Sequence, residues 1–226
     1  MRVRNLARSA ISLFVLSAVV VLCYRAILLP AGAPLYPWAS DTLGHVLKAE
    51  YLQQQLRAGF WYPDLLPNWY LGLQMLRYHP PLPYYLLVGL IPMTGDAVTA
   101  ANWFIVLCAL VGGLGWLPYT RWLGWAPALI GGALYTFLPD NIRVAFAEGN
   151  LPRVLASALL PWAVYFMLRG LETTGRRWHR LALSLCFAAF VLSHAMMAAI
   201  YAACCTLLCV ALWIGRSTTA RAAAST

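Results

Sequence analysis

Asp41, His45 and Lys48 follow one another at intervals of four and three residues in a segment with helical periodicity. At about 100° per residue, their side chains share one face of a helix. An imidazole one turn from a carboxylate can orient that carboxylate or share its proton, which is an arrangement used in general acid–base catalysis. A simpler interpretation stays open, in which Asp41 complements the dipole of the helix start and the rest of the face is solvated.

Other ionisable residues fall in short segments farther along the chain. Arg77 and His79 stand just before an apolar segment, and His194 interrupts a long apolar run. A single charge at a membrane interface is weak evidence for a site, so convergence of several is the stronger signal. The residues that we predict to line one cavity are Asp41, His45, Arg77, His79, Arg143 and Glu148.

The composition places these residues in a membrane protein. The chain has 226 residues, of which 62% are apolar and 10% charged, and its mean hydropathy is +0.69. These values are far outside the range of soluble globular domains. The net charge of +9 does not indicate nucleic-acid binding, because the arginines stand at the ends of apolar runs. The six cysteines all fall in apolar segments, which favours small buried hydrophobes over disulfides or a metal site.

The apolar runs predict an all-α, polytopic transmembrane helical bundle. The predicted spans lie near residues 10–29, 97–118, 122–138, 152–168, 181–194 and 195–214. A spanning helix needs about twenty apolar residues, so residues 82–92 predict a partly inserted or tilted helix rather than a span. Residues 1–33 resemble a secretory signal, but their apolar run is long for a signal core, and we expect a retained anchor.

The positions of Lys and Arg predict the orientation. With a cytoplasmic N-terminus, the inner segments hold ten arginines and the outer segments hold six of the seven acidic residues. This agrees with the positive-inside rule. We therefore expect a first outer loop at residues 30–96 and a second at 139–151, on the extracytoplasmic face of a bacterial inner membrane.

The first outer loop is predicted to be folded, with helices lying on the membrane surface. Ser40 is a plausible N-cap and Gly59 a plausible stop, which gives a helix of about eighteen residues. Leu43, Val46 and Leu47 would face the membrane, while Asp41, His45 and Lys48 would be displayed on the opposite side. The next turns of the chain are rich in Trp and Tyr. Such side chains either anchor a protein at the lipid headgroups or form platforms for sugar rings.

This order of features resembles the C-type membrane glycosyltransferases, which use sugars linked to polyprenyl phosphate. It is most similar to bacterial membrane proteins labelled 6-pyruvoyl-tetrahydropterin-synthase-related. The resemblance covers about residues 10–200 and rests on residues 67–72 (PNWYLG), residues 79–85 (HPPLPYY), Arg143 with Glu148, and residues 192–194 (LSH).

The resemblance implies a catalytic role for the first-loop acid, Asp41, with His45 as its partner. The leaving group of the reaction is a lipid phosphate, and fixed cations would stabilise the negative charge that develops on it. Guanidinium groups can bind a phosphate bidentately. Arg77, Arg143 and Arg153 are the candidates, with His79, Asp140, Glu148 and His194 in support. Some members of the superfamily bind a divalent metal through outer-loop acids, which leaves open Mg²⁺ or Mn²⁺ at Asp41 and Glu148.

The predicted function is therefore transfer of a sugar from a polyprenyl-phosphate donor to an extracytoplasmic acceptor, with Asp41 as general base. The alternative is a non-catalytic membrane scaffold or a lipid or polyprenol transporter subunit. Because members of the superfamily are much longer, we expect residues 1–226 to be one transmembrane module from the N-terminal part of a larger protein. The alternative is a short module that works with a membrane-protein partner.

Overall fold

The structure is a computed structural model. It describes the backbone of residues 2–28, 40–67, 69–172 and 177–223, and the side chains of these ranges from residue 6 to residue 215. Residues 29–39 of the predicted first outer loop lie outside the described residues. Within the described part the chain is helical, and the pairing of Leu66 with Leu73 is an isolated bridge rather than a strand.

The longer helices are α1 (Arg2–Leu28), α2 (Thr42–Arg57), α4 (Leu82–Thr94), α5 (Ala97–Leu114), α7 (Trp125–Thr136), α9 (Leu151–Leu171), α10 (Arg177–Ser193) and α11 (Ala195–Ala223). The short elements are α3 (Met75–Tyr78), η1 (Leu117–Tyr119), α6 (Thr120–Leu123), α8 (Pro139–Arg143) and η2 (Val144–Glu148), a single turn of π-helix. The prediction of an all-α protein is thus confirmed for the described residues.

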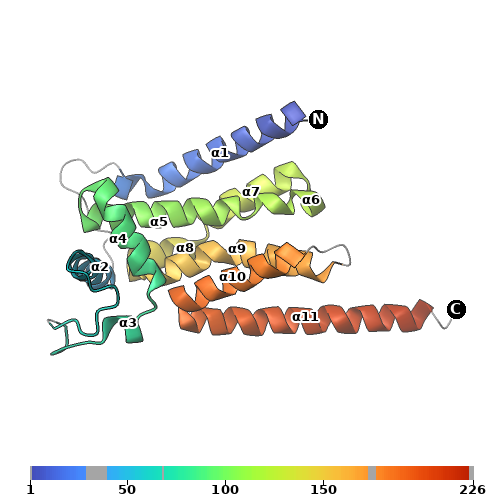
Figure 1. Cartoon of the computed structure of the whole chain (residues 1–226). Helices are drawn as coiled ribbons and strands as arrows, with labels where there is room; N and C mark the ends of the chain where they lie inside the picture. The colour runs from blue at the N-terminus through green and yellow to red at the C-terminus, as the bar shows by residue number, and fades with distance from the viewer. Residues whose placement is uncertain (1, 29–39, 68, 173–176, 224–226) are drawn as a thin grey trace.

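The long helices run side by side, and α2 lies across one end of the bundle, where it is seen nearly end-on (Figure 1). Helix α5 is central, because it packs against α1, α4, α7 and α9. Small residues allow the closest of these approaches: a Cβ added to Gly132 of α7 would lie 2.5 Å from the Gly113 carbonyl oxygen of α5. Helices in membranes commonly approach through such small residues.

Among the residues that the structure describes, four helices are long and apolar enough to cross a membrane: Leu6–Leu28, Ala97–Leu123, Leu151–Leu171 and Ala195–Gly215. The predicted count of six spans is not confirmed. The segment expected at 122–138 contains the 12-residue helix α7, and that at 181–194 lies in the 17-residue helix α10. At 1.5 Å per residue, α7 is only about 18 Å long, well short of a hydrocarbon core of about 30 Å.

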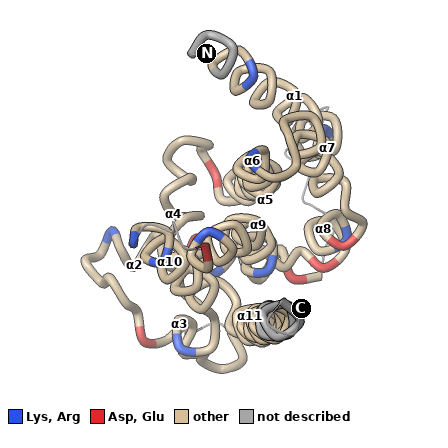
Figure 2. The backbone as a smooth tube through the Cα atoms, turned by 90° about the vertical axis from the view of Figure 1, so that its right-hand side faces the viewer, with Lys and Arg blue, Asp and Glu red and all other residues tan. Residues whose placement is uncertain are grey.

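Most acidic residues of the described part lie at one end of the bundle, together with cations such as Lys48 and Arg77. The end that carries α2, α3 and α8, here called the acid-rich end, holds Asp41, Glu50, Asp64, Asp96, Asp140 and Glu148. The opposite, cation-rich end carries α6 and the starts of α1 and α10, and Figure 2 views the molecule from that side. Among the described side chains it holds Arg8, Arg121, Arg169, Arg177 and Arg180, with Glu172 as the acid. Which end faces the cytoplasm stays a prediction.

Helix α2 corrects the prediction of a surface helix with a displayed polar face. The helix has 16 residues, and its N-cap is Asp41 rather than Ser40. His45 and Lys48 are only 6% and 4% exposed, whereas Leu43 is 62% exposed. The reason is that α2 packs against α4 and α5, and His45 and Lys48 lie on its buried face together with Val46, Ala49 and Leu52, where protein groups replace water as their partners.

Candidate functional site

A polar cavity of 520 Å³ opens at the acid-rich end. Four parts of the chain build it: the start of α2, the segment around α3, the junction that precedes α9 and the junction that precedes α11. Its polar lining includes Asp41, His45, Arg77, His79, Asn150 and His194. We call it the polar cavity. Five of these six residues are among the candidates named from the sequence, and Arg143 and Glu148 are not part of the lining.

The predicted first and second outer loops contact each other beside this cavity. The backbone N–H of Asp41 donates to the carbonyl of Glu148 at 3.0 Å, and the Ser40 hydroxyl donates to the same oxygen at 3.2 Å. Glu148 ends the π-helical turn η2, where a carbonyl lacks a partner within its own helix. The start of α2 therefore satisfies the end of η2, and this fixes the Asp41 backbone at the rim of the cavity.

His45 is held by a tyrosine from a different helix. Its Nδ1 lies 2.9 Å from the hydroxyl of Tyr84 of α4, which is fully buried. Burial, and secondarily the positive charge of Lys48, lowers the pKa of His45 to about 3. His45 is therefore neutral near pH 7. Because Nδ1 is engaged by Tyr84, Nε2 is the ring nitrogen left for a partner in the cavity.

His79 completes this aromatic group. Its ring meets the ring of Tyr84 edge to face, with centroids 6.3 Å apart. Burial, and secondarily the charge of Lys48, lowers the pKa of His79 to about 4. Two neutral imidazoles thus stand close to the exposed carboxylate of Asp41. A neutral imidazole offers one N–H donor and one nitrogen acceptor for hydrogen bonds.

Lys48 lies behind the cavity and has an aromatic partner. Its Nζ sits 4.7 Å from the centroid of the Trp69 ring, and burial lowers its pKa while the charge of Asp41 opposes that shift. Gly44 makes room for this contact, because a Cβ there would lie 3.1 Å from the Trp69 ring. Trp69 therefore packs against α2. The neighbouring Tyr70 is 85% exposed and is available for anchoring at the membrane interface.

The charged residues of the second outer loop form a closed square of ion pairs. Asp140 accepts from Arg143 at 2.6 Å and from Arg153 at 3.0 Å. Glu148 accepts from both arginines as well, at 3.1 Å in the case of Arg153. These contacts hold the pKa of Asp140 below its usual range, chiefly through the hydrogen bond from Arg143. Each guanidinium is already occupied by two carboxylates, so Arg77 is the candidate phosphate ligand that the structure places in the polar cavity.

The resemblance implies a divalent metal at Asp41 and Glu148, and the arrangement of the acidic and histidine side chains bears on it. Among the residues that the structure describes, no three His, Cys, Asp or Glu side chains are placed to hold a metal ion. The Glu148 carboxylate is bound by two guanidinium groups. The pair Asp41 and Glu148 therefore does not fit a metal site in this arrangement.

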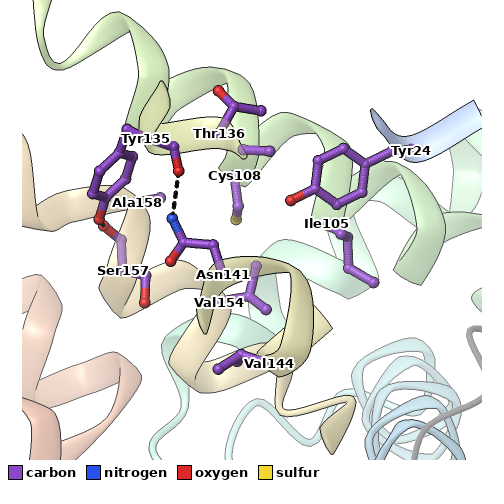
Figure 3. Close-up of a pocket in the computed structure, with 11 residues that line it drawn as sticks. Tyr24, Ile105, Cys108, Tyr135, Thr136, Asn141, Val144, Val154, Ser157 and Ala158 are labelled. Atoms are coloured by element: carbon purple, nitrogen blue, oxygen red, sulfur yellow. Dashed lines mark hydrogen bonds between the residues drawn. The ribbon is translucent and has the colours of Figure 1, made fainter. Parts of the chain in front are cut away.

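A second cavity, inside the bundle, is too small to compete as a substrate site. It has a volume of 20 Å³ and lies between α1, α5, α8 and α9 (Figure 3). Asn141 and Tyr24 point into it, and Asn141 also donates to the Tyr135 carbonyl at 2.8 Å. This volume suits a single water molecule, which needs about 10–15 Å³. The polar cavity is therefore the candidate site.

Two residues of the site received no role from the sequence. Tyr84 lies within the HPPLPYY segment, but nothing in the pattern indicates that it faces His45 thirty-nine residues earlier. Asn150 lines the cavity, and its Oδ1 also accepts the Arg153 backbone N–H at 3.1 Å as the N-cap of α9. An Asn before Leu-Pro is a recognisable cap signal, so its position could have been found from the sequence.

Comparison with known proteins gives one match. A family model described as the 6-pyruvoyl-tetrahydropterin synthase related domain, a membrane protein, matches residues 76–224. The match begins at α3 and runs through α11. It therefore includes the segment of Arg77 and His79, the second outer loop and His194. Neither a search of curated proteins nor a search of solved structures finds a match.

Proposed function

The chain belongs to the membrane-protein family described by the 6-pyruvoyl-tetrahydropterin synthase related domain, and we propose that it is a C-type membrane glycosyltransferase. In this proposal, the polar cavity binds a polyprenyl-phosphate sugar and an acceptor on the extracytoplasmic side of a bacterial inner membrane. The observation that carries the proposal is the cavity itself, in which the Asp41 carboxylate, neutral imidazoles and the Arg77 guanidinium share one opening of 520 Å³.

Asp41 acts as the general base. An inverting transfer needs a carboxylate to take the proton of the acceptor hydroxyl while the anomeric carbon develops positive charge. The side chain of Asp41 is exposed and makes no capping bond to the helix that it precedes. Its contact within the described residues is the hydroxyl of Ser40, at 3.3 Å. The carboxylate is therefore accessible to an acceptor, which a helix-capping role would have prevented.

His45 orients the substrate or the Asp41 carboxylate rather than carrying a charge. Because its pKa lies near 3, it stays neutral through the reaction. In the tautomer in which Nδ1 accepts from the Tyr84 hydroxyl, the proton is on Nε2 and His45 presents a hydrogen-bond donor to the cavity.

Arg77 stabilises the phosphate that leaves with the lipid. Its guanidinium contacts the amide oxygen of Gln74 at 3.2 Å, and within the described part of the chain it has no carboxylate partner. A planar guanidinium can bind a phosphate bidentately. Negative charge develops on that phosphate as the glycosidic bond breaks, so the guanidinium stabilises it. Arg143 and Arg153 hold the second loop in place through their ion pairs with Asp140 and Glu148.

The hydrocarbon chain of the donor has a suitable groove beside the cavity. An apolar groove of 400 Å³ lies between α4, α5 and α9, with Leu86, Leu90, Phe104 and Leu107 in its lining. Helix α4 connects the two places, because Pro81 precedes it at the polar cavity and its later residues line the groove. A lipid with its head at Arg77 would thus find an apolar path along α4.

Asp41→Asn tests the proposal. Asn keeps the size of the side chain and its ability to start a helix, so that folding and membrane insertion should persist. Loss of a positioned general base lowers the rate by about 10²–10⁴-fold. The assay is sugar transfer from a polyprenyl-phosphate donor in membranes that contain the protein. Asp64→Asn is the matched control, because Asp64 is an exposed acid of the same loop outside the cavity. Unchanged transfer by Asp41→Asn would remove Asp41 from catalysis.

A scaffold role is the second candidate, and one observation favours it. Only 6% of the Ala195–Gly215 span is buried within the chain, so most of α11 is available to other membrane segments. If membranes containing the wild-type protein transfer no sugar, and the protein co-purifies with another membrane protein in amounts that depend on α11, the scaffold role replaces the glycosyltransferase.

A further inference from the structure

A pocket of 300 Å³ lies at the cation-rich end, on the opposite side of the molecule from the polar cavity. It is formed where the start of α1 meets η1, α6 and the start of α7. Its lining consists of Arg8, Ser9, Ser12, Leu117, Thr120 and Trp125. We call it the Arg8 pocket.

The pocket is built by a partly buried hydrogen bond that joins two helices and by a second one within α1. The Trp125 indole N–H of α7 donates to the Ser12 hydroxyl of α1 at 2.9 Å. Ser12 is only 2% exposed, and its hydroxyl donates in turn to the Arg8 carbonyl at 2.8 Å. This chain of bonds fixes the indole ring, and the Arg8 guanidinium lies over it with Cζ 5.8 Å from the ring centroid.

This arrangement leaves Arg8 able to bind an anion. A cation–π contact uses the face of the guanidinium, whereas its N–H groups point outward in the plane and remain available. Within the described residues no carboxylate pairs with Arg8, in contrast to Arg121 and Arg169 at the same end, which both contact Glu172. The exposed Ser9 adds a hydroxyl donor beside it.

The position of the pocket along the membrane-spanning helices indicates which kind of anion it would bind. Arg8 is two residues from the start of the Leu6–Leu28 span, and Thr120 is three residues from the end of the Ala97–Leu123 span. Both are therefore within one helical turn, about 5.4 Å, of the end of a span. This is the level of the lipid headgroups when these helices cross a bilayer, and basic pockets between helices at this level suit anionic headgroups.

We propose that the Arg8 pocket binds the phosphate of an anionic membrane phospholipid. The Arg8 guanidinium pairs with the phosphate oxygens, Ser9 donates to the headgroup, and Leu117 lies where the acyl chains begin. The proposal does not depend on the glycosyltransferase reaction, because it uses residues at the opposite end of the bundle.

Native mass spectrometry of the purified full chain, with phosphatidylglycerol or phosphatidylcholine added in equal amounts, tests this site. The wild-type protein should retain phosphatidylglycerol in preference. Arg8→Gln should lower the retention of phosphatidylglycerol by about fivefold, the usual effect of one arginine near an anionic surface. Arg180→Gln is the matched control: it removes the same charge from the same end, outside the pocket, and should retain the wild-type preference.

Trp125→Phe separates a built pocket from general electrostatic attraction. It leaves the net charge and the aromatic ring in place but removes the indole N–H that bonds to Ser12. We expect weaker retention of phosphatidylglycerol in this variant, and it carries the test if Arg8→Gln does not fold. Equal losses in Arg8→Gln and Arg180→Gln, or wild-type retention in both pocket variants, would overturn the proposal.

Adding inorganic phosphate in the same mass-spectrometry experiment distinguishes a lipid site from a site for free phosphate. Inorganic phosphate should not displace phosphatidylglycerol from the wild-type protein, because it lacks the acyl chains that the membrane-level position of the pocket accommodates. Displacement by inorganic phosphate that is absent in Arg8→Gln would show that the pocket takes the free ion and would overturn the assignment to a lipid.

Discussion

His45 and His79 are imidazoles whose chemistry is set by burial rather than by a carboxylate. Both pKa values are lowered, to about 3 and about 4, mainly by desolvation and next by the charge of Lys48. A histidine near pKa 6.5 would be half charged close to neutral pH. These two stay neutral there, so the cavity keeps the Asp41 carboxylate and the Arg77 guanidinium as its charged groups among the described lining residues.

We predict that the protein loses stability as the pH falls from about 6.5 towards 4. In this window the unfolded chain binds protons at its histidines, whereas folded His45 and His79 remain neutral down to about pH 3 and 4. Because the unfolded state binds more protons, stability decreases with decreasing pH. Thermal unfolding in detergent at pH 7 and pH 4.5 measures the effect.

His45→Asn should make this pH dependence shallower, because it removes the group with the more strongly lowered pKa. His194→Asn is a less sensitive comparison, since His194 is half-buried and its pKa is also lowered by burial. A steeper loss in His45→Asn than in the wild type would contradict the account of a neutral, buried imidazole.

At the scale of elements, the predicted second outer loop consists of α8 and the π-helical turn η2, held by the square of ion pairs. The two arginines of the square differ in burial: the side chain of Arg153 is 22% exposed and that of Arg143 is 49% exposed. Pairs that are well hydrated contribute little to stability, because water screens them, whereas a partly buried charge left without a partner is costly.

We therefore predict that Arg153→Gln destabilises the protein more than Arg143→Gln does. The loss for Arg153→Gln should be about 1 kcal/mol, as for one member of an ion-pair network. The two variants remove the same charge from the same pair of acids, so each serves as the control for the other. Their midpoints of chemical unfolding measure the difference, and a larger loss for Arg143→Gln would contradict the burial argument.

The contact between α5 and α7 gives a second prediction at this scale. A Cβ at position 132 would lie 2.5 Å from a backbone carbonyl oxygen, which cannot move aside as a side chain can. Gly132→Ala should therefore destabilise the protein by about 1–3 kcal/mol through overpacking. Gly89→Ala is the control, because a Cβ there meets nothing within 4 Å, and alanine is the better helix former. Thermal unfolding compares the two, and equal stability would exclude the close approach.

At the scale of the whole molecule, the bundle has chemically different ends. The acid-rich end bears the polar cavity and both outer loops, and the cation-rich end bears the Arg8 pocket. Cations are retained on the cytoplasmic side of membrane proteins. The two sites are thus proposed to face opposite sides of the membrane, with lipid-linked substrate on one side and anionic lipid on the other.

Cysteine labelling in intact cells tests this orientation. Asp64→Cys at the acid-rich end should react with a membrane-impermeant thiol reagent added outside, and Trp178→Cys at the cation-rich end should not. The native cysteines serve as the background, since all six lie in apolar helices. Labelling of position 178 from outside would reverse the predicted orientation.

Sequence alone determined the class of the protein and the coarse distribution of its charges. Runs of twenty or more apolar residues can be stable only in a membrane, and their backbone can be satisfied there only as helices or closed barrels. The helical spacing of Asp41, His45 and Lys48 also placed these residues on one face. Periodicity fixes such relative positions within one helix, because the helix geometry is local.

Tertiary structure decided which way that face points and which residues meet on it. In a membrane protein an apolar face can contact either lipid or the protein interior, so the pattern of α2 did not reveal that His45 and Lys48 turn inward. Several contacts of the site join segments that are far apart in the sequence or that fold back on each other. They are the contact of the Tyr84 hydroxyl with His45, that of the Glu148 carbonyl with Asp41, and the ion pairs of Arg143 and Arg153. Such contacts depend on how helices pack, which no local spacing encodes, and they decide that Arg77 rather than Arg143 or Arg153 lines the cavity.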